Sequence, residues 1–200
     1  MPARASIVNG DFETGDFTGW DINDSVVPTA IPISAAVSTF NGSQVAQMQY
    51  AGDQAGILAG AISQDFVASA GQLLKFQMYM RLESDAATGQ PSGNHIFRGS
   101  LTNLDTNSTL PFVTYTTPGT GPFMTIFNFG TYGINTPLST GNYRLRFSTE
   151  LNNVAGINTQ YLFRLDNVRL VPEPATWITG LVGALALTCV AWRRSRQATN

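Results

Sequence analysis

An alternating run from Leu74 to Leu82 constrains the fold more than any other feature of the sequence. Its apolar and polar residues fall on opposite faces of an extended chain: Leu74, Phe76, Met78, Met80 and Leu82 against Lys75, Gln77, Tyr79 and Arg81. A period of two is that of a β-strand with one buried face. No window shows an equally convincing helical period, so the sequence predicts an all-β fold.

Shorter runs of the same kind recur within residues 46–50, 62–66, 123–129 and 143–147. Turn-forming residues separate them, as at Asn41-Gly42-Ser43 and Thr140-Gly141-Asn142. Spacing of this kind predicts about eight to ten strands and a single antiparallel β-sandwich, a jelly roll, over residues 6–170. The polar stretches Asp85–Asn94 and Thr114–Pro122 are expected to be surface loops.

Charge and cysteine content exclude two kinds of protein. Residues 1–170 hold eight bases against twelve acids, a net charge of 8 − 12 = −4, so nucleic acid is not an expected partner. The single cysteine, Cys189, allows no disulfide within the chain. The sandwich must therefore be stabilised by its core or by a bound ion.

The tail has a different character. Residues 175–192 form an uncharged run of about 18 residues, near the shortest length that spans a membrane as a helix. Arg193, Arg194 and Arg196 follow at once, and positive-inside bias places this basic segment, residues 193–200, in the cytoplasm. The alternative is a short buried core helix that ends in a solvated basic patch.

The motif Val171-Pro172-Glu173-Pro174 stands directly before this run. Together with the apolar span and the arginine cluster, it resembles the PEP-CTERM sorting signal of Gram-negative bacteria. The resemblance implies recognition and cleavage by an exosortase near residues 171–174. The protein would then be exported, held in the inner membrane with residues 6–170 on the periplasmic side, and delivered to the cell surface or matrix after processing.

The start of the chain also suggests export. Ala3-Arg4-Ala5 matches the small-x-small pattern that precedes signal-peptidase cleavage, so residues 1–5 are interpreted as the remnant of a signal peptide. Ser6-Ile7-Val8-Asn9-Gly10 is then expected to form the first strand of the mature domain.

A second resemblance involves both ends of the domain. Asn9-Gly10-Asp11-Phe12-Glu13, followed by Gly19-Trp20, resembles the opening of jelly-roll carbohydrate-binding modules, and residues 163–170 resemble their closing strand. Gln64-Asp65-Phe66 matches the middle of the same pattern. The resemblance implies a structural Ca²⁺ between opening and closing strands, held by Glu13 and Asp166 with main-chain oxygens near Gly10 or Asp11.

Acidic residues support that expectation from the sequence itself. Five of the domain's twelve acids lie in the opening region with no base among them: Asp11, Glu13, Asp16, Asp21 and Asp24. A hard cation such as Ca²⁺ would relieve their repulsion through oxygen ligands. The alternative is that these residues terminate turns and face solvent.

The polar face of the 74–82 strand is the best candidate platform for a glycan. Tyr79 alternates outward with Gln77 and Arg81, and an exposed ring flanked by hydrogen-bonding groups suits a pyranose. Tyr132 is a further candidate. The alternative is that Tyr79 packs against a neighbouring strand or loop.

Catalysis is not expected. Some jelly-roll glycosidases use paired carboxylates on one strand, and Glu83 with Asp85 is the only nearby pair. A single histidine, His95, and the absence of cysteine from the domain disfavour nucleophilic triads and zinc sites. The sequence therefore predicts an exported structural or adhesive protein of the envelope or biofilm; the alternatives are an exopolysaccharide-binding module and, less favoured, a glycoside hydrolase.

Overall fold

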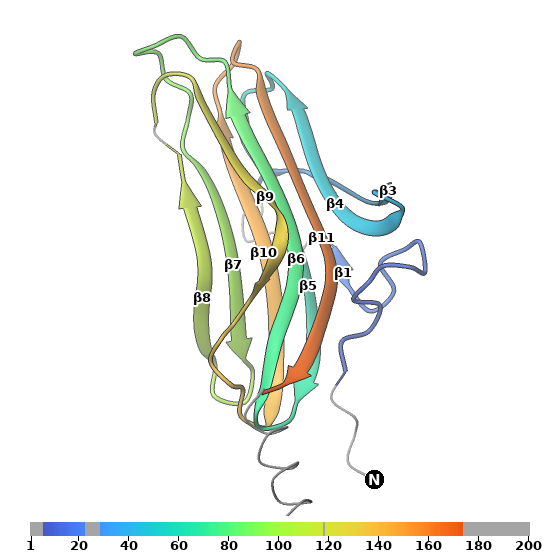
Figure 1. The fold of residues 1–200 in the computed structure, drawn as a ribbon. Coiled ribbons are helices and arrows are strands. Elements are labelled where there is room, and N and C mark those ends of the chain that lie inside the picture. The colour runs from blue at the N-terminus through green and yellow to red at the C-terminus, as the bar shows by residue number, and fades with distance from the viewer. Residues whose placement is uncertain (1–5, 23–28, 118, 174–200) are drawn as a thin grey trace, which may run out of the picture.

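The computed structural model describes residues 6–22, 29–117 and 119–173 (Figure 1). Two packed β-sheets make up this part of the chain, which contains no helix and hence none able to span a membrane. The predicted all-β antiparallel sandwich is confirmed. The predicted span at residues 175–192, the basic segment 193–200, Pro174 and residues 1–5 lie outside the described residues.

One sheet, here called sheet A, has six strands in the order β1-β5-β10-β7-β8, with the short β2 alongside β5. All neighbours are antiparallel except β2 and β5. The strands are β1 (Asp21–Ile22), β2 (Ile31–Pro32), β5 (Gly56–Ala68), β7 (His95–Asn103), β8 (Ser108–Thr116) and β10 (Gly141–Asn153). The predicted loop from Thr114 thus begins only after β8 ends.

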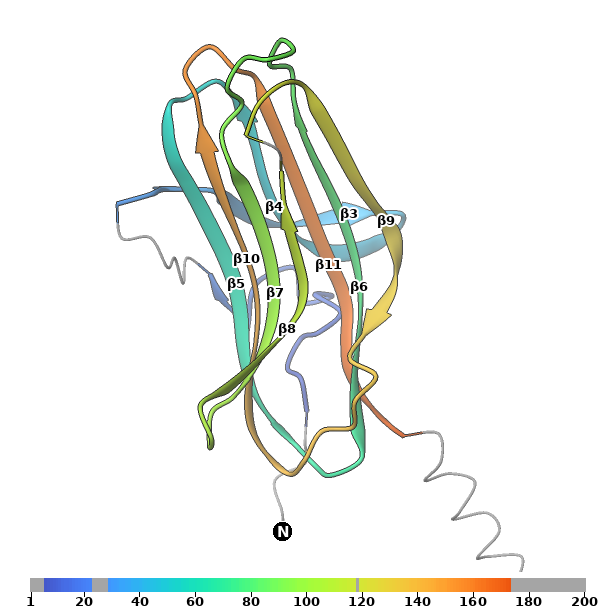
Figure 2. The same ribbon diagram turned by 90° about the vertical axis from the view of Figure 1, so that its left-hand side faces the viewer.

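The other sheet, sheet B, is five-stranded and antiparallel, in the order β3-β4-β11-β6-β9. Its strands are β3 (Ser34–Phe40), β4 (Ser43–Gly52), β6 (Gln72–Ser84), β9 (Phe123–Gly133) and β11 (Thr159–Pro172). The alternating run that predicted the fold is β6, and its apolar residues are buried while its polar ones are not. Figure 2 shows the two sheets side by side, with β6 and β11 in one and β5 and β10 in the other.

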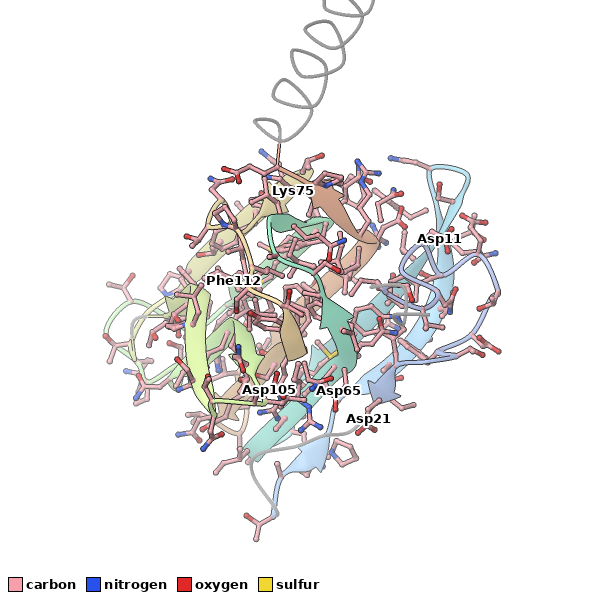
Figure 3. The ribbon with its side chains drawn as sticks, turned by 90° about the horizontal axis from the view of Figure 1, so that it is seen from below. Asp11, Asp21, Asp65, Lys75, Asp105 and Phe112 are labelled. Atoms are coloured by element: carbon pink, nitrogen blue, oxygen red, sulfur yellow. The ribbon has the colours of Figure 1, made fainter. Side chains whose placement is uncertain are left out.

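Aromatic rings fill the space between the sheets. Phe147 of β10 lies at the centre, with ring centroids 5.2 Å from Phe76 and 5.3 Å from Phe163 of the opposite sheet. Phe112 of β8 lies 5.7 Å from the same ring. In Figure 3, Phe112 and Asp11 lie on opposite sides of the molecule when it is viewed from below. This aromatic layer supplies the core that the cysteine-poor sequence requires.

The predicted first strand at residues 6–10 is wrong, because these residues form no strand. Val8 bonds instead to a side chain: its N–H donates to Gln64 Oε1 at 3.1 Å, and Gln64 Nε2 donates to its carbonyl at 2.8 Å. Asn9 then turns the chain at a φ of 47°. A buried glutamine of β5 thus satisfies the backbone groups that a strand partner would otherwise pair.

Candidate ligand-binding face

The outer face of sheet B carries the residues that the sequence proposes for sugar binding. Tyr79, Gln77 and Arg81 alternate with the buried residues of β6, so they point away from the core. Arg164 of β11 is paired in register with Tyr79 on one side and Gln47 of β4 on the other. One row of side chains therefore crosses the middle of this face.

A β-bulge in β9 extends that row. The register between β6 and β9 shifts between Met78 and Met80, so Asn128 and Phe129 both lie opposite Tyr79. The sequence pattern placed Phe129 on the same face as Phe127, which is wrong because a bulge shifts the alternation by one residue. Phe129 instead lies beside Phe40 of β3, with ring centroids 5.4 Å apart.

Phe40 covers the guanidinium of Arg164. The Arg164 Cζ lies 4.1 Å from the Phe40 ring centroid and 5.8 Å from that of Tyr79, so cation–π attraction holds the group between two rings. Arg164 Nε also donates to Gln47 Oε1 at 3.0 Å. We call Phe40, Arg164 and Phe129 the aromatic clasp. Tyr79 thus faces outward as predicted, but beneath the clasp and half-buried.

The clasp shows that this face is concave. β3 and β9 are the two edge strands of sheet B, with three strands between them. In a flat sheet they would lie about 19 Å apart, four spacings of about 4.8 Å. Contact between Phe40 and Phe129 requires the two edges to approach each other. The turn end of the β3–β4 hairpin curves away from the body of the sandwich in Figure 1, and in Figure 2 the hairpin runs across β11 and β6 with its turn toward β9.

Beside the clasp, the concave face holds a depression of about 510 Å³. The outward side chains that line it come from four adjacent strands: Ser34, Gln49, Ala51, Arg81, Gln160 and Leu162. Arg81 donates from both Nε and Nη2 to Glu83 Oε2, at 3.1 and 2.7 Å, and this raises the pKa of its guanidinium. Hydrogen-bonding groups therefore surround two apolar side chains, Ala51 and the larger Leu162.

Two of the proposed glycan residues, Tyr132 and Gln77, do not line the depression. Tyr132 is paired with the buried Phe76 and its ring stacks on it at 6.3 Å, so it lies on the inner side of sheet B, across the sheet from Tyr79. Gln77 lies on the outer side but accepts a hydrogen bond from Asn167 Nδ2 at 2.9 Å. Among the proposed residues, only Arg81 borders the depression directly.

The depression includes residues that the sequence reading missed. Gln160 and Leu162 alternate with the buried Tyr161 and Phe163 of the closing strand, so the period of two contained the signal for them. Phe40 gave no such signal, because only the curl of its hairpin brings it over the sheet.

The carboxylate pair proposed for the hydrolase alternative lies just outside the depression. Glu83 is engaged by Arg81, as described above. Asp85 Oδ1 accepts a hydrogen bond from the backbone N–H of Asn158 at 2.8 Å. Both carboxylates therefore have structural partners.

The proposed Ca²⁺ ligands are electrostatically coupled. Burial raises the pKa of Asp166, and the charges of Glu13 and Asp11 raise it further. Its two oxygens accept from the backbone and side chain of Asn167, while Glu13 Oε1 accepts from the backbone of Gln44. Within residues 6–22, 29–117 and 119–173, however, no three His, Cys, Asp or Glu side chains are grouped closely enough to hold a metal. Main-chain oxygens would have to complete any site.

The residues predicted to form a sorting motif begin where the sandwich ends. β11 finishes at Pro172, which is exposed, and the backbone N–H of Glu173 donates to the carbonyl of Gly71 at 2.8 Å. Val171 is paired with Leu73 of β6. The first part of the motif is therefore an extension of the closing strand.

Known proteins resemble this chain in structure only. No family model and no curated protein matches the sequence. A structure of TmCBM61 in complex with β-1,4-galactotriose is 16% identical, covers 86% of this chain and 100% of its own, and has a TM-score of 0.50. The K1 cleaved adhesin domain of Lys-gingipain from Porphyromonas gingivalis is 12% identical, with 84% and 97% coverage and a TM-score of 0.46.

A carbohydrate-binding module specific for non-crystalline cellulose, CBM28, is 16% identical, with 84% and 95% coverage and a TM-score of 0.44. At these identities the likeness concerns architecture alone. The chain is therefore similar in fold to TmCBM61, the neighbour with a TM-score of 0.50.

Proposed function

We propose that this protein is a non-catalytic, exported surface protein whose sandwich binds polysaccharide in the depression on sheet B. The observation that carries the proposal is the depression of about 510 Å³ on a concave sheet face. Sugar sites combine a shaped hollow, an apolar contact and a few fixed polar groups. Leu162 supplies the apolar contact, and Gln49, Gln160 and Arg81 supply the polar groups.

The Arg81 guanidinium is held in place before any ligand binds, and this favours its role as a polar group in the site. Its guanidinium is held by two hydrogen bonds to one oxygen of Glu83, so less side-chain freedom is lost when a ligand binds. Arginine and amide groups offer donors and acceptors to sugar hydroxyls. The exposed Ile126, on β9 opposite Arg81, extends the apolar surface toward one edge.

Arg81→Ala tests this site directly, with Arg98→Ala as a matched control. Both arginines lie on strands, are similarly exposed at 41% and 47%, and pair with a glutamate, but Arg98 is in sheet A. The probes are β-1,4-galactan, amorphous cellulose, xylan and exopolysaccharide purified from the organism that carries the gene, each in affinity gels. We expect Arg81→Ala to weaken retention at least tenfold and Arg98→Ala to leave it unchanged.

Equal retention of both variants would show that the depression is not the polysaccharide-binding site. If the wild-type protein binds none of the four polysaccharides, the structural or adhesive role without a glycan ligand is favoured. Loss of biofilm or flocculation on gene deletion would then support that role.

Export through a PEP-CTERM signal is the second part of the proposal. It is supported by the order of the motif, the apolar run 175–192 and the three arginines. The exposed Pro172 at the end of β11 is consistent with access by an exosortase. Mass spectrometry of the mature protein from its native host is expected to find a chain that ends near residues 171–174; an intact Asn200 contradicts this.

A further inference from the structure

We infer that β9 pairs with β9 of a second copy of this chain, in a two-fold antiparallel ladder over Phe123–Phe127. The inference concerns one edge of sheet B and not the depression itself. It follows from the free edge of β9, from the side chains exposed on that edge and from the order of its residues.

β9 has a free edge. Within residues 6–22, 29–117 and 119–173 it pairs with β6 on one side and with no strand on the other. Its first half forms the right-hand margin of sheet B in Figure 2. The backbone groups of such an edge can pair with another chain unless charged side chains, prolines or bulges prevent it. No charged residue occurs in Phe123–Gly133.

The regular part of this edge is the segment Phe123–Phe127. Pro122 precedes it and lacks the N–H that would extend a ladder. The bulge at Asn128 and Phe129 follows it and interrupts the alternation. A regular ladder with a partner strand is therefore confined to this segment.

Exposed apolar side chains lie on the segment. Met124 is 64% exposed and Ile126 is 45% exposed, and both point to the outer face of sheet B, opposite Glu83 and Arg81. β3, the other edge strand, is described in full and exposes no large apolar side chain. Pairing at β9 removes apolar surface from water, whereas pairing at β3 gains no such burial.

The order of the residues makes the segment complementary to itself. Phe-Met-Thr-Ile-Phe presents the same classes of side chain when it is read in either direction. In an antiparallel ladder centred on Thr125, Phe123 of one copy lies opposite Phe127 of the other. Met124 lies opposite Ile126, and the two Thr125 residues face each other. Aromatic, apolar and threonine pairs of this kind stabilise antiparallel strands, so a second copy fits this edge.

The segment is held in place before a partner binds. The Tyr115 hydroxyl of β8 contacts the Thr125 hydroxyl, and the Tyr115 ring lies 5.9 Å from that of Phe127. The Phe123 ring lies 5.6 Å from that of His95. These inward side chains fix β9 against sheet A, so little freedom is lost when a partner strand pairs with it.

The two-fold axis of such a ladder is perpendicular to sheet B. Sheet B then continues into the second copy, and the concave faces of both copies open on the same side. The two strands that carry Arg81 lie three spacings apart, about 14 Å. Both depressions thus face one polysaccharide, a consequence that rests on the proposed function, whereas the association itself needs no ligand.

Charge substitutions at the two exposed positions test the inference and its register. Sedimentation velocity of the full-length chain in detergent, over a wide range of protein concentration, measures association, and we expect the wild type to form dimers as the concentration rises. Met124→Lys with Ile126→Lys places like charges opposite each other and is expected to weaken dimerisation about tenfold or more. Met124→Lys with Ile126→Glu places opposite charges there and is expected to restore it.

Val67→Lys is the control, because Val67 is also exposed, at 38%, but lies on β5 of sheet A. We expect it to dimerise as the wild type does. The inference is overturned by a wild type that is monomeric at every concentration, or by a double-lysine variant that associates as strongly as the wild type. A lysine–glutamate variant that stays monomeric, while circular dichroism shows it folded, also overturns it.

These measurements contain no polysaccharide. Failure of dimerisation therefore leaves the proposed function intact, and failure of retention on the four polysaccharide gels leaves the dimer intact. The two failures are distinguishable.

Discussion

Burial of the chain's only histidine links the stability of the sandwich to pH. His95 is fully buried at the start of β7, 5.6 Å from the Phe123 ring. Burial lowers its pKa from 6.5 to about 4, and a hydrogen bond with the backbone of Ser92 offsets this only in part. The folded protein therefore keeps the ring neutral at pH values where the unfolded chain binds a proton.

We predict that His95 destabilises the fold as the pH falls from about 6.5 to 4. Protons then bind the unfolded chain preferentially, and the loss reaches about 3 kcal/mol at the folded pKa. Well above pH 6.5 the ring is neutral in both states and contributes nothing to the pH dependence. Urea unfolding of the wild type and His95→Phe across this range measures the difference, and an identical pH dependence in both contradicts the prediction.

Asp166 has the opposite linkage. Burial and the neighbouring acids raise its pKa, so the ionised carboxylate costs stability at neutral pH, and that cost falls as the pH drops through the folded pKa. In excess chelator at pH 7 we expect Asp166→Asn to melt at a higher temperature than the wild type. The exposed Asp53→Asn is the control and is expected to change little.

Adding Ca²⁺ distinguishes a Ca²⁺-binding site from a group of carboxylates that only repel one another. If the carboxylates hold the ion, Ca²⁺ raises the melting temperature of the wild type and much less that of Asp166→Asn. A wild-type melting curve that is the same in chelator and in Ca²⁺ would show that these carboxylates hold no Ca²⁺.

Among the elements, the opening segment around Gly10 pairs with β11 beyond the point where β4 stops pairing with it. The ladder between β4 and β11 ends at Ala46 and Leu165, where β4 departs into its curled hairpin. Just beyond, the backbone N–H of Val168 donates to the carbonyl of Gly10 at 2.8 Å. The opening segment thus closes the edge that the hairpin leaves open.

We expect Gly10→Ala to loosen this docking. A Cβ at Gly10 would lie 2.0 Å from the carbonyl oxygen of Val168, so the backbone must shift, at a cost of about 1–3 kcal/mol. Gly130→Ala is the control, because its Cβ would meet no atom closer than 3.7 Å. Thermal unfolding measures both; equal stability of the two variants would show that the segment adapts freely.

At the scale of the whole molecule, stability depends on rings that touch both sheets. Phe147 contacts Phe97 of its own sheet and Phe76 and Phe163 of the other. Phe147→Ala is expected to cost about 3–5 kcal/mol, since it leaves a large cavity. We expect far- and near-ultraviolet circular dichroism to lose signal in one transition, and separate transitions would show that the sheets unfold independently.

The sequence by itself determined the all-β class, the buried faces of the central strands and the outward direction of Tyr79 and Arg81. A strand repeats every two residues, so local order alone reveals which side is buried. Those features depend on neighbours along the chain.

Only the tertiary structure decided what the outer face looks like. The bulge at Asn128 and Phe129 depends on pairing with β6. The position of Phe40 depends on the curl of its hairpin over Arg164, which lies 124 residues later in the chain (164 − 40), and no local pattern records that contact. The inward direction of Tyr132 and the absence of a strand at residues 6–10 have the same cause. Partners far away in the sequence decide which way a side chain points and which groups the backbone hydrogen-bonds to.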